Sequence, residues 1–336
     1  MPIFVDHIGE GHHLFSNPGR AHVRPRDALL IGVVNNMPDG ALVSTERQLF
    51  DLLLAAAPDA PLHLKFYALP TVLRSEWGCD HVEHFYFGVD DLCDTTLDGL
   101  IVTGAEPRAK ELKDEPYWSD FARVINWAGT GTSSTIWSCL AVHATVLFLD
   151  DVNRRPLGKK CIGVFEQSRI KSHPILTGMP HTMPMPHSRW NEIPEEALRD
   201  HGYEVLTRSE ESGIDTFVKE HGRSQFVFLQ GHPEYEALSL LGEYRRDIGR
   251  FLRGESEDYP TMPKHYFSEP VRQLLSTFRD NALFDRRAEL LARFPVATAS
   301  VGVEHVWQKG AHQLYRNWLA LLRGRKEKEH QNVRPI

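Results

Sequence analysis

The chain has 336 residues, 41% hydrophobic and 25% charged, which are the proportions of a folded globular protein with a sizeable core. Its formal net charge of −7 argues against a nucleic-acid-binding surface, because phosphate binding needs a concentrated basic face. The four cysteines are widely separated and the first residues include no apolar run, so we expect no disulfide framework, no structural zinc site, no secretory signal and a cytoplasmic location.

Strand and helix patterns alternate over the first half of the chain. Residues 1–27 are rich in His, Pro, Gly and Arg and are expected to form an irregular arm. Continuous or alternating apolar runs predict strands at 28–34, 62–68, 97–104 and 133–138. Helical spacing predicts a helix after a cap at Ser44 or Thr45, another over 117–128, and an apolar helix from Leu140. The alternation predicts an α/β fold, a mostly parallel sheet flanked by helices.

The second half of the chain changes its pattern. Short strands and turns are expected between residues 150 and 230, including strands at 214–218 and 225–230. Helical spacing then predicts helices over 235–252, 283–294 and 313–322, followed by a charged, frayed tail at 323–336. With no repeat and no linker, residues 28–322 are expected to form one domain in which 266–322 is a helical extension. No apolar stretch is long enough to span a membrane.

Cys139 is the first candidate for catalysis. It follows the expected strand at 133–138 and precedes the apolar helix, so its thiol is expected at the carboxyl edge of the sheet, on a strand-to-helix turn. Free N–H groups and the positive partial charge of a helix N-terminus stabilise a thiolate and bind an oxyanion. A buried structural cysteine is the alternative, and a nearby base decides between the two.

His232 and Glu234, in G-H-P-E-Y, are the candidate partners of this thiol. The expected strand at 225–230 ends just before His232, and Pro233 stiffens the link to Glu234. In such a triad the carboxylate orients the imidazole, and the imidazole deprotonates the thiol. A His-Pro-acid sequence also occurs in ordinary turns, so the tripeptide carries little weight by itself.

These two placements resemble the class I glutamine amidotransferase-like superfamily, in which a cysteine follows a strand and His-x-Glu comes much later. Within that superfamily the chain resembles the homoserine O-acyltransferases, the O-succinyltransferases and O-acetyltransferases, because nine short motifs occur in their order. The resemblance covers roughly residues 28–265 and resumes near 306–322. The motifs are N-x-M-P (35–38), T-G-A (103–105), Y-W (117–118), C-x-A-V-x-A (139–144), K-x-x-G-V-[YF]-E (160–166), P-H-S-R (186–189), G-H-P-E-Y (231–235), R-D (246–247) and N-W-L (317–319).

The resemblance implies a flavodoxin-like sandwich and an acyl-CoA-dependent enzyme of methionine biosynthesis. Cys139 would take the acyl group from the coenzyme A thioester as an acyl-enzyme, in a ping-pong sequence. His232 would be general base and acid, held by Glu234. Acyl-CoA is a co-substrate, so no cofactor and no metal site are expected. The family pattern also implies a homodimer.

The resemblance further implies which residues bind L-homoserine. Lys160 matches a lysine of the family's site, and Arg189 and Arg246 match its homoserine-binding arginines. A guanidinium suits the α-carboxylate, while Glu243, three residues before Arg246 on the same helix face, suits the ammonium group. Each has a simpler alternative: the lysine, beside another lysine, is solvated, Arg189 stacks on an aromatic ring, or the neighbouring Arg245 replaces Arg246.

One run departs from the family pattern, T-G-A-E-P-R in place of T-G-A-P. Its proline is displaced to Pro107, which has no N–H, so the oxyanion donors are expected to be the amide of Leu140 and one from Ala105, Glu106 or Arg108. An arginine near the acyl chain favours a donor with a terminal carboxylate, so Arg108 favours succinyl-CoA over acetyl-CoA. The alternative is that Arg108 points outward or pairs with an acid.

We therefore expect transfer of a succinyl group from succinyl-CoA to the hydroxyl of L-homoserine. Acetyl transfer from acetyl-CoA to homoserine or serine is the first alternative. A glutamine amidotransferase-type amidase is the second, but those enzymes set their cysteine in G-x-C-x-G, and the W-S-C-L-A of residues 137–141 has no glycine there. A non-catalytic binding protein on the same scaffold would not need the cysteine, histidine and glutamate.

Overall fold

The structure, a computed structural model, describes residues 3–6, 27–58 and 60–332. Its centre is a sheet of eight strands in the order β1-β3-β2-β4-β5-β12-β11-β8, in which the first six run parallel and β11 and β8 are antiparallel to their neighbours. The α/β class and the mostly parallel sheet are as predicted. The strands are β1 (Ile3–Asp6), β2 (Leu29–Val34), β3 (Leu62–Tyr67), β4 (Gly99–Val102), β5 (Ser134–Ser138), β8 (Glu204–Val205), β11 (Thr216–His221) and β12 (Ser224–Leu229).

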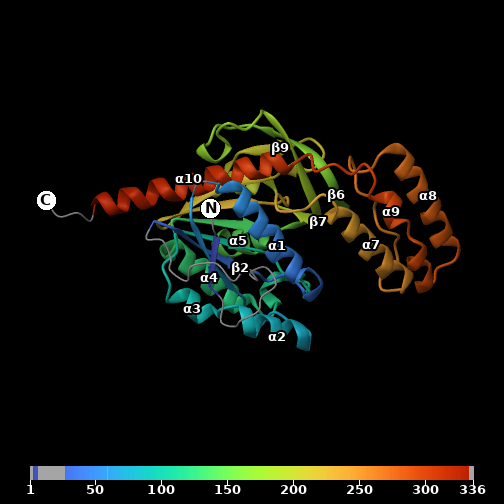
Figure 1. The fold of residues 1–336 in the computed structure, drawn as a ribbon, viewed down its shortest axis with the longest axis horizontal. Helices are drawn as coiled ribbons and strands as arrows, with labels where there is room; N and C mark the ends of the chain where they lie inside the picture. The colour runs from blue at the N-terminus through green and yellow to red at the C-terminus, as the bar shows by residue number, and fades with distance from the viewer. Residues whose placement is uncertain (1–2, 7–26, 59, 333–336) are drawn as a thin grey trace.

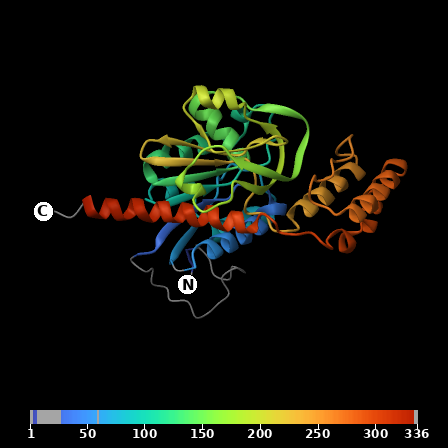
Figure 2. The same cartoon turned by 90° about the horizontal axis from the view of Figure 1, so that it is seen from above.

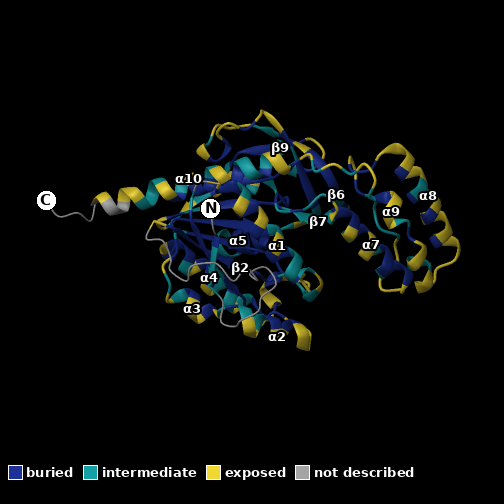
Figure 3. Ribbon diagram, in the orientation of Figure 1, coloured by how far each residue is buried: buried dark blue, intermediate teal, exposed yellow. Residues whose placement is uncertain are grey.

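Helices cover both faces of this sheet (Figures 1 and 3). One face packs against α1 (Asp39–Ala56), α2 (Glu76–Phe85) and α10 (Gln308–Asn332), and the other against α3 (Val89–Cys93), α4 (Trp118–Gly131), α5 (Leu140–Asp150) and α6 (Glu195–Asp200). The continuous apolar runs of the central strands are buried on both faces, as a parallel sheet between two helical layers requires.

A second sheet lies beside the first and carries a helical lobe. It has the order β10-β9-β6-β7 and is antiparallel, formed by β6 (Arg155–Arg169), β7 (Thr182–Glu192), β9 (Thr207–Ser209) and β10 (Gly213–Ile214). Apolar residues of β6 pack against α7 (Ser239–Leu252) in a core shared with α8 (Glu269–Phe284) and α9 (Val296–Ala299). These three helices project from one side of the molecule (Figures 1 and 2). The described residues also include the 3-10 segments Leu112–Asp114, Pro174–Leu176 and Ala288–Arg293.

Three local predictions in this part of the chain differ from the structure. Residues 3–6 of the expected irregular arm form β1, which pairs with β3 at the sheet edge; residues 7–26 lie outside the described part of the chain. The helix expected after Ser44 or Thr45 begins at Asp39, whose carboxylate favours a helix N-terminus. The helix expected over 283–294 is wrong, because α8 ends at Phe284 and a 3-10 turn follows. There Arg286 stacks on Phe251 and donates to its carbonyl oxygen at 2.7 Å, which holds the segment against the end of α7.

The last helix, α10, is longer than predicted and is anchored at the amino edge of the sheet. It continues through the expected frayed tail to Asn332. Arg325 donates to the carbonyl oxygen of Ser133 at 2.8 Å, and Lys326 reaches the carboxylate of Asp98 at 2.7 Å. In the described part of the chain, no helix combines the length and apolar character needed to cross a lipid bilayer.

Candidate active site

Two neighbouring strands bring the catalytic candidates together. β5 and β12 are parallel, with Leu229 opposite Ser138, so the residues that follow each strand meet at the carboxyl edge. The N–H of Cys139 donates to the carbonyl oxygen of Leu229 at 2.9 Å. The imidazole of His232 is hydrogen-bonded to the side chain of Cys139. Position 139 therefore has a base in contact with its thiol.

Cys139 sits on a strained turn. Its φ of 52° and ψ of −114° lie in a region that side chains other than glycine rarely adopt, and it immediately precedes α5. The turn is closely packed against the end of β4: a Cβ added at Gly104 would lie 2.6 Å from the Cβ of Leu140 and 2.9 Å from its nitrogen. Only glycine at position 104 therefore allows α5 to begin here, with its N-terminal amides facing the thiol's surroundings.

The imidazole of His232 is held on two sides. Its Nδ1 lies 2.8 Å from Oε1 of Glu234, and the ring of Tyr235 stacks on it with centroids 4.2 Å apart. Burial disfavours the charged imidazolium, but the charges and hydrogen bonds of Cys139 and Glu234 outweigh it and hold the pKa of His232 well above its usual value. The imidazole of His232 is therefore held in its protonated form beside Cys139 and Glu234.

Tyr235 connects this pair to the rest of the site. Its hydroxyl donates to Oε1 of Glu243, and burial together with that carboxylate raises its pKa well above the usual value, so the hydroxyl stays protonated. Its backbone carbonyl accepts a hydrogen bond at 2.8 Å from the indole of Trp307, a fully buried residue that precedes α10. The backbone of Tyr235, whose ring stacks on His232, is thus held by a residue from the C-terminal part of the chain.

A compact charge cluster lies on the other side of Tyr235. Lys160 of β6 is 2.7 Å from Asp247 and 3.3 Å from Glu243, and Arg246 is 3.0 Å from Asp247 and 3.5 Å from Glu243. Burial opposes ionisation of Glu243, but the charges of Lys160 and Arg246 and its hydrogen bonds outweigh it and lower its pKa. Ser188 of β7 also donates to Glu243. The cluster thus holds two cations and two anions, of which Arg246 is the most exposed.

Arg189 is not part of this cluster. Successive side chains of a strand point to opposite faces, so Ser188 faces Glu243 and Arg189 faces away. Arg189 is buried and donates to the carbonyl oxygens of Asn191, at 2.7 Å, and Ser212. The structure therefore brings Lys160, Glu243 and Arg246 together, and Arg189 lies on the opposite face of β7.

Residues of the T-G-A-E-P-R run, which departs from the family pattern, line a pocket, and Gly104 just before them packs against Leu140. The pocket is lined by Asn36, Pro38, Thr71, Val72, Leu73, Ala105, Glu106, Arg108, Glu115, Pro116 and Tyr117. The N–H of Arg108 donates to Glu115 at 2.5 Å, so this amide is already occupied. Glu106 pairs with Arg250, not with Arg108, and no ion pair of Arg108 is found among the described residues. The amides of Ala105 and Glu106 remain as candidate oxyanion donors, together with the amide of Leu140.

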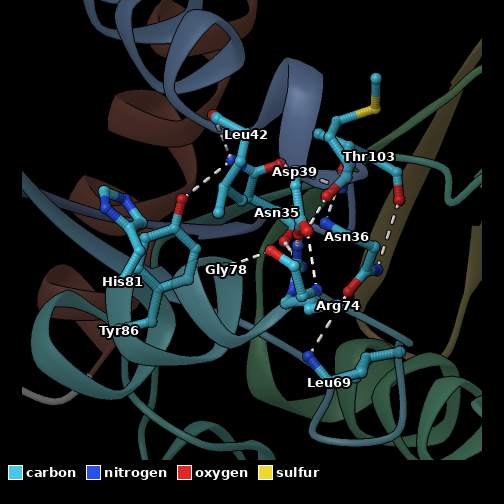
Figure 4. A network of polar contacts seen from close by, with 12 residues as sticks. Asn35, Asn36, Asp39, Leu42, Leu69, Arg74, Gly78, His81, Tyr86 and Thr103 are labelled. Carbon is cyan, nitrogen blue, oxygen red and sulfur yellow. Dashed lines mark hydrogen bonds and ion pairs between the residues drawn. The ribbon is translucent and has the colours of Figure 1, made fainter.

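A polar network fixes the neighbouring N-x-M-P loop (Figure 4). Arg74 donates to the carbonyl oxygens of Met37 at 2.7 Å and of Asn35 at 3.1 Å. The backbone N–H of Asn36 donates to the hydroxyl of Thr103 at 2.8 Å. The network thereby connects this loop to the end of β4, beside which α5 begins.

Sequence reasoning missed three residues of the site: Ser188, Tyr235 and Asp247. Each lies inside one of the motifs P-H-S-R, G-H-P-E-Y and R-D, next to a residue that was predicted. Their contacts depend on which strand face and which helix turn they occupy. Ile162 of β6 lies opposite Ser188 of β7, and Lys160 shares a strand face with Ile162. The pairing of β6 with β7 is therefore needed to see that Ser188 and Lys160 lie on the same face.

Comparisons with known proteins point to one family. The family model described as homoserine O-succinyltransferase matches residues 7–326. Relatives with that name include proteins of Rhodopseudomonas palustris (46% identity; 87% of each chain), Methylorubrum extorquens (46%; 88% of each) and Bradyrhizobium japonicum (45%; 91% of this chain and 94% of the relative).

Similar solved structures include glutamine amidotransferases at far lower identity. One, from Thermotoga maritima, has 11% identity and a TM-score of 0.47, covering 89% of this chain and 99% of the other. Another, from Methylobacillus flagellatus, has 15% identity and a TM-score of 0.47, covering 88% and 95%. The sequence matches, which span most of the chain, decide the assignment: this chain belongs to the homoserine O-succinyltransferase family.

Proposed function

We propose that this chain transfers a succinyl group from succinyl-CoA to the hydroxyl of L-homoserine, a step of methionine biosynthesis, through an acyl-enzyme on Cys139. The observation that carries the proposal is the continuous contact from Cys139 through His232 and Tyr235 to Glu243. This contact supports a nucleophile and base that act beside a charge cluster whose groups would suit an amino acid. The names of the relatives support the same donor and acceptor.

In the first half-reaction the thiolate of Cys139 attacks the thioester carbonyl carbon of succinyl-CoA. The resulting oxyanion is stabilised by the amide of Leu140, at the N-terminus of α5, and by that of Ala105 or Glu106. The carbon–sulfur bond to coenzyme A then breaks, and the imidazolium of His232 gives its proton to the departing thiolate. The products are free coenzyme A and a succinyl thioester on the enzyme.

In the second half-reaction the homoserine hydroxyl attacks this thioester. The now neutral His232 takes the hydroxyl proton as the new carbon–oxygen bond forms. The bond to Cys139 breaks, the thiolate is regenerated, and the protonated imidazole pairs with it again. Glu234, through Nδ1 of the ring, keeps the other nitrogen directed at the reacting atoms.

Homoserine binding is assigned to the charge cluster. Glu243, whose carboxylate stays ionised, accepts the ammonium group, and the exposed fork of Arg246 binds the α-carboxylate. Lys160 and Asp247 hold these two side chains in place. Arg189, held by backbone carbonyls on the opposite strand face, is given no contact with homoserine.

Replacing Arg246 with alanine tests this assignment. Loss of a charge-assisted, bidentate contact is expected to raise the KM for homoserine about 30-fold, with a smaller change in kcat, because the contact exists before the chemical step. The matched control is Arg245→Ala, which removes the neighbouring exposed arginine of the same helix. Equal effects of the two variants in steady-state kinetics would contradict the assignment.

Arg108 provides the corresponding test for the acyl donor. It lines the pocket formed by residues of the T-G-A-E-P-R run, where its guanidinium can receive the free carboxylate of a succinyl group. Arg108→Glu is expected to lower the ratio of kcat/KM for succinyl-CoA over acetyl-CoA about tenfold. Lys110→Glu makes the same charge reversal at an exposed position outside the pocket lining and should leave the ratio unchanged. A wild-type preference for acetyl-CoA would defeat the proposed donor.

The reaction type is tested by an activity matrix of donors and acceptors. With succinyl-CoA and homoserine, initial rates should give parallel double-reciprocal lines, the kinetic signature of an acyl-enzyme. Serine and acetyl-CoA should be poor substitutes. Ammonia release from glutamine, without acyl transfer, would instead indicate an amidase.

We also propose a homodimer in the cytoplasm. Cys79, Cys93, Cys139 and Cys161 are free thiols and Cys79 is exposed, which suits a reducing compartment. The homodimer is carried over from the family resemblance. Light scattering of the purified protein tests it, and a monomeric mass at working concentrations would contradict it.

A further inference from the structure

Behind the catalytic histidine lies a second carboxylate that the mechanism above does not use. Asp215, between β10 and β11, is fully buried. Its Oδ1 accepts the backbone N–H of Gly231 at 2.7 Å, and its Oδ2 accepts the hydroxyl of Thr216 at 2.8 Å. Gly231 immediately precedes His232, so this carboxylate is attached directly to the turn that carries the base.

Gly231 makes the attachment close. A Cβ added there would lie 2.9 Å from Oδ1 of Asp215 and 2.4 Å from the side chain of Met185, so a larger residue would separate the turn from the carboxylate. The N–H of His232 itself donates to the carbonyl oxygen of Pro186 at 2.8 Å. Two successive amides of the turn are therefore fixed to buried acceptors, one of which is ionisable.

Asp215 also faces other charged and titratable groups. On β7, the imidazole of His187 lies 3.6 Å from Oδ1 and the buried guanidinium of Arg189 is close enough to act on the carboxylate. Burial raises the pKa of Asp215, against the hydrogen bonds from Thr216 and Gly231 and the charges of Arg189 and His232. Burial lowers the pKa of His187 well below its usual value, so that ring is neutral. Among the groups that oppose this effect of burial, Arg189 carries a permanent positive charge, which favours the ionised carboxylate.

We propose that Asp215 is a positioning residue for His232, fixing its turn through Gly231 and placing a second negative charge behind the imidazole. The inference rests on the proposed function, because it assigns Asp215 to the base of that reaction. The groups that face His232 are then Cys139 before α5, Glu234 and Tyr235 beyond β12, His187 on β7, and Asp215. Arg189, which matches an arginine expected to bind homoserine, serves instead to balance Asp215.

The test separates charge from hydrogen bonding with Asp215→Asn. The amide oxygen of asparagine can still accept from Gly231, but the negative charge is lost. In the acyl-enzyme Cys139 carries no charge, so removing the anion at 215 should make His232 easier to deprotonate. The acidic limb of the pH profile of kcat/KM for homoserine is then expected to move about one unit to lower pH. An unchanged limb would overturn the proposal.

A measurement without turnover separates this proposal from the proposed function. In the Cys139→Ala protein, the pKa of His232 is followed by NMR of labelled histidine, with the signal assigned by its loss in His232→Asn. Asp215→Asn in that background should lower the pKa of His232 by about one unit. A wild-type enzyme that transfers no succinyl group contradicts the function alone, and an unchanged His232 pKa contradicts the role of Asp215 alone.

Two further variants complete the design. Asp98→Asn makes the same replacement at a carboxylate that also accepts a backbone N–H, that of Leu30 at 2.8 Å, but at the opposite edge of the sheet. It should leave the pH profile unchanged. If Asp215→Asn does not fold, Thr216→Val removes only the hydroxyl donor to Oδ2, so Asp215 keeps its charge over a narrower pH range. A smaller shift in the same direction supports the proposal, and no shift overturns it.

Discussion

Cys139→Ala is expected to reduce succinyl transfer by about four orders of magnitude or more, because no other nucleophile replaces the thiolate held at the N-terminus of α5. Mass spectrometry gives the direct measurement. Wild-type protein mixed with succinyl-CoA, without acceptor, should gain one succinyl group on the peptide that contains Cys139. The alanine variant should gain none, and adding homoserine to the acylated wild type should remove the label.

The matched control is Cys79→Ser, which removes an exposed thiol on α2. This variant should be acylated and turn over like the wild type, which excludes labelling of the most accessible cysteine. Acylation of the Cys139→Ala protein at the wild-type rate would contradict the nucleophile assignment. Loss of acylation in Cys79→Ser would do so as well.

His232→Asn is expected to reduce transfer by about three orders of magnitude, since one side chain acts as acid in the first half-reaction and as base in the second. The pKa of His232 is raised by its thiolate and carboxylate partners, so in the free enzyme the imidazole is protonated at neutral pH and stabilises the thiolate. Alkylation of Cys139 by iodoacetamide should therefore persist to low pH in the wild type. In the variant it should require a higher pH.

His181→Asn provides the control for this variant, because His181 is an exposed histidine just before β7. Its transfer rate and alkylation profile should match the wild type. Equal alkylation profiles for His232→Asn and the wild type would show that the imidazole does not stabilise the thiolate. The triad would then lose its chemical basis.

The elements that place the nucleophile and base were predictable from sequence because their signals are local. Both residues come after buried strands: Cys139 directly follows β5, and Gln230 and Gly231 separate the end of β12 from His232. Adjacent parallel strands end at the same edge of the sheet, so two residues far apart in sequence meet without further information. Predicting their contact also requires that β5 and β12 be neighbours in the sheet. No local sequence pattern specifies that pairing.

The acceptor side of the site was less predictable because it depends on pairing between strands. β6 and β7 pair with a change of register between Pro156 and Cys161, and such an irregularity decides which side chains share a face. Ser188 lies in the regular part of this pairing, opposite Ile162, and it is Ser188, not Arg189, that contacts Glu243. The helix expected over 283–294 failed for a related reason: helical spacing of its apolar residues is also satisfied by a 3-10 turn held against α7.

The hydrogen bond from Trp307 to Tyr235 has a consequence for the time at which activity arises during translation. Every strand of the central sheet has been synthesised by the end of β12, yet the backbone carbonyl of Tyr235, whose ring stacks on His232, receives this bond only when a much later segment has left the ribosome. A nascent chain can thus complete its sheet before its catalytic imidazole is fully supported. Newly made protein should become competent for transfer only after release of its last helix.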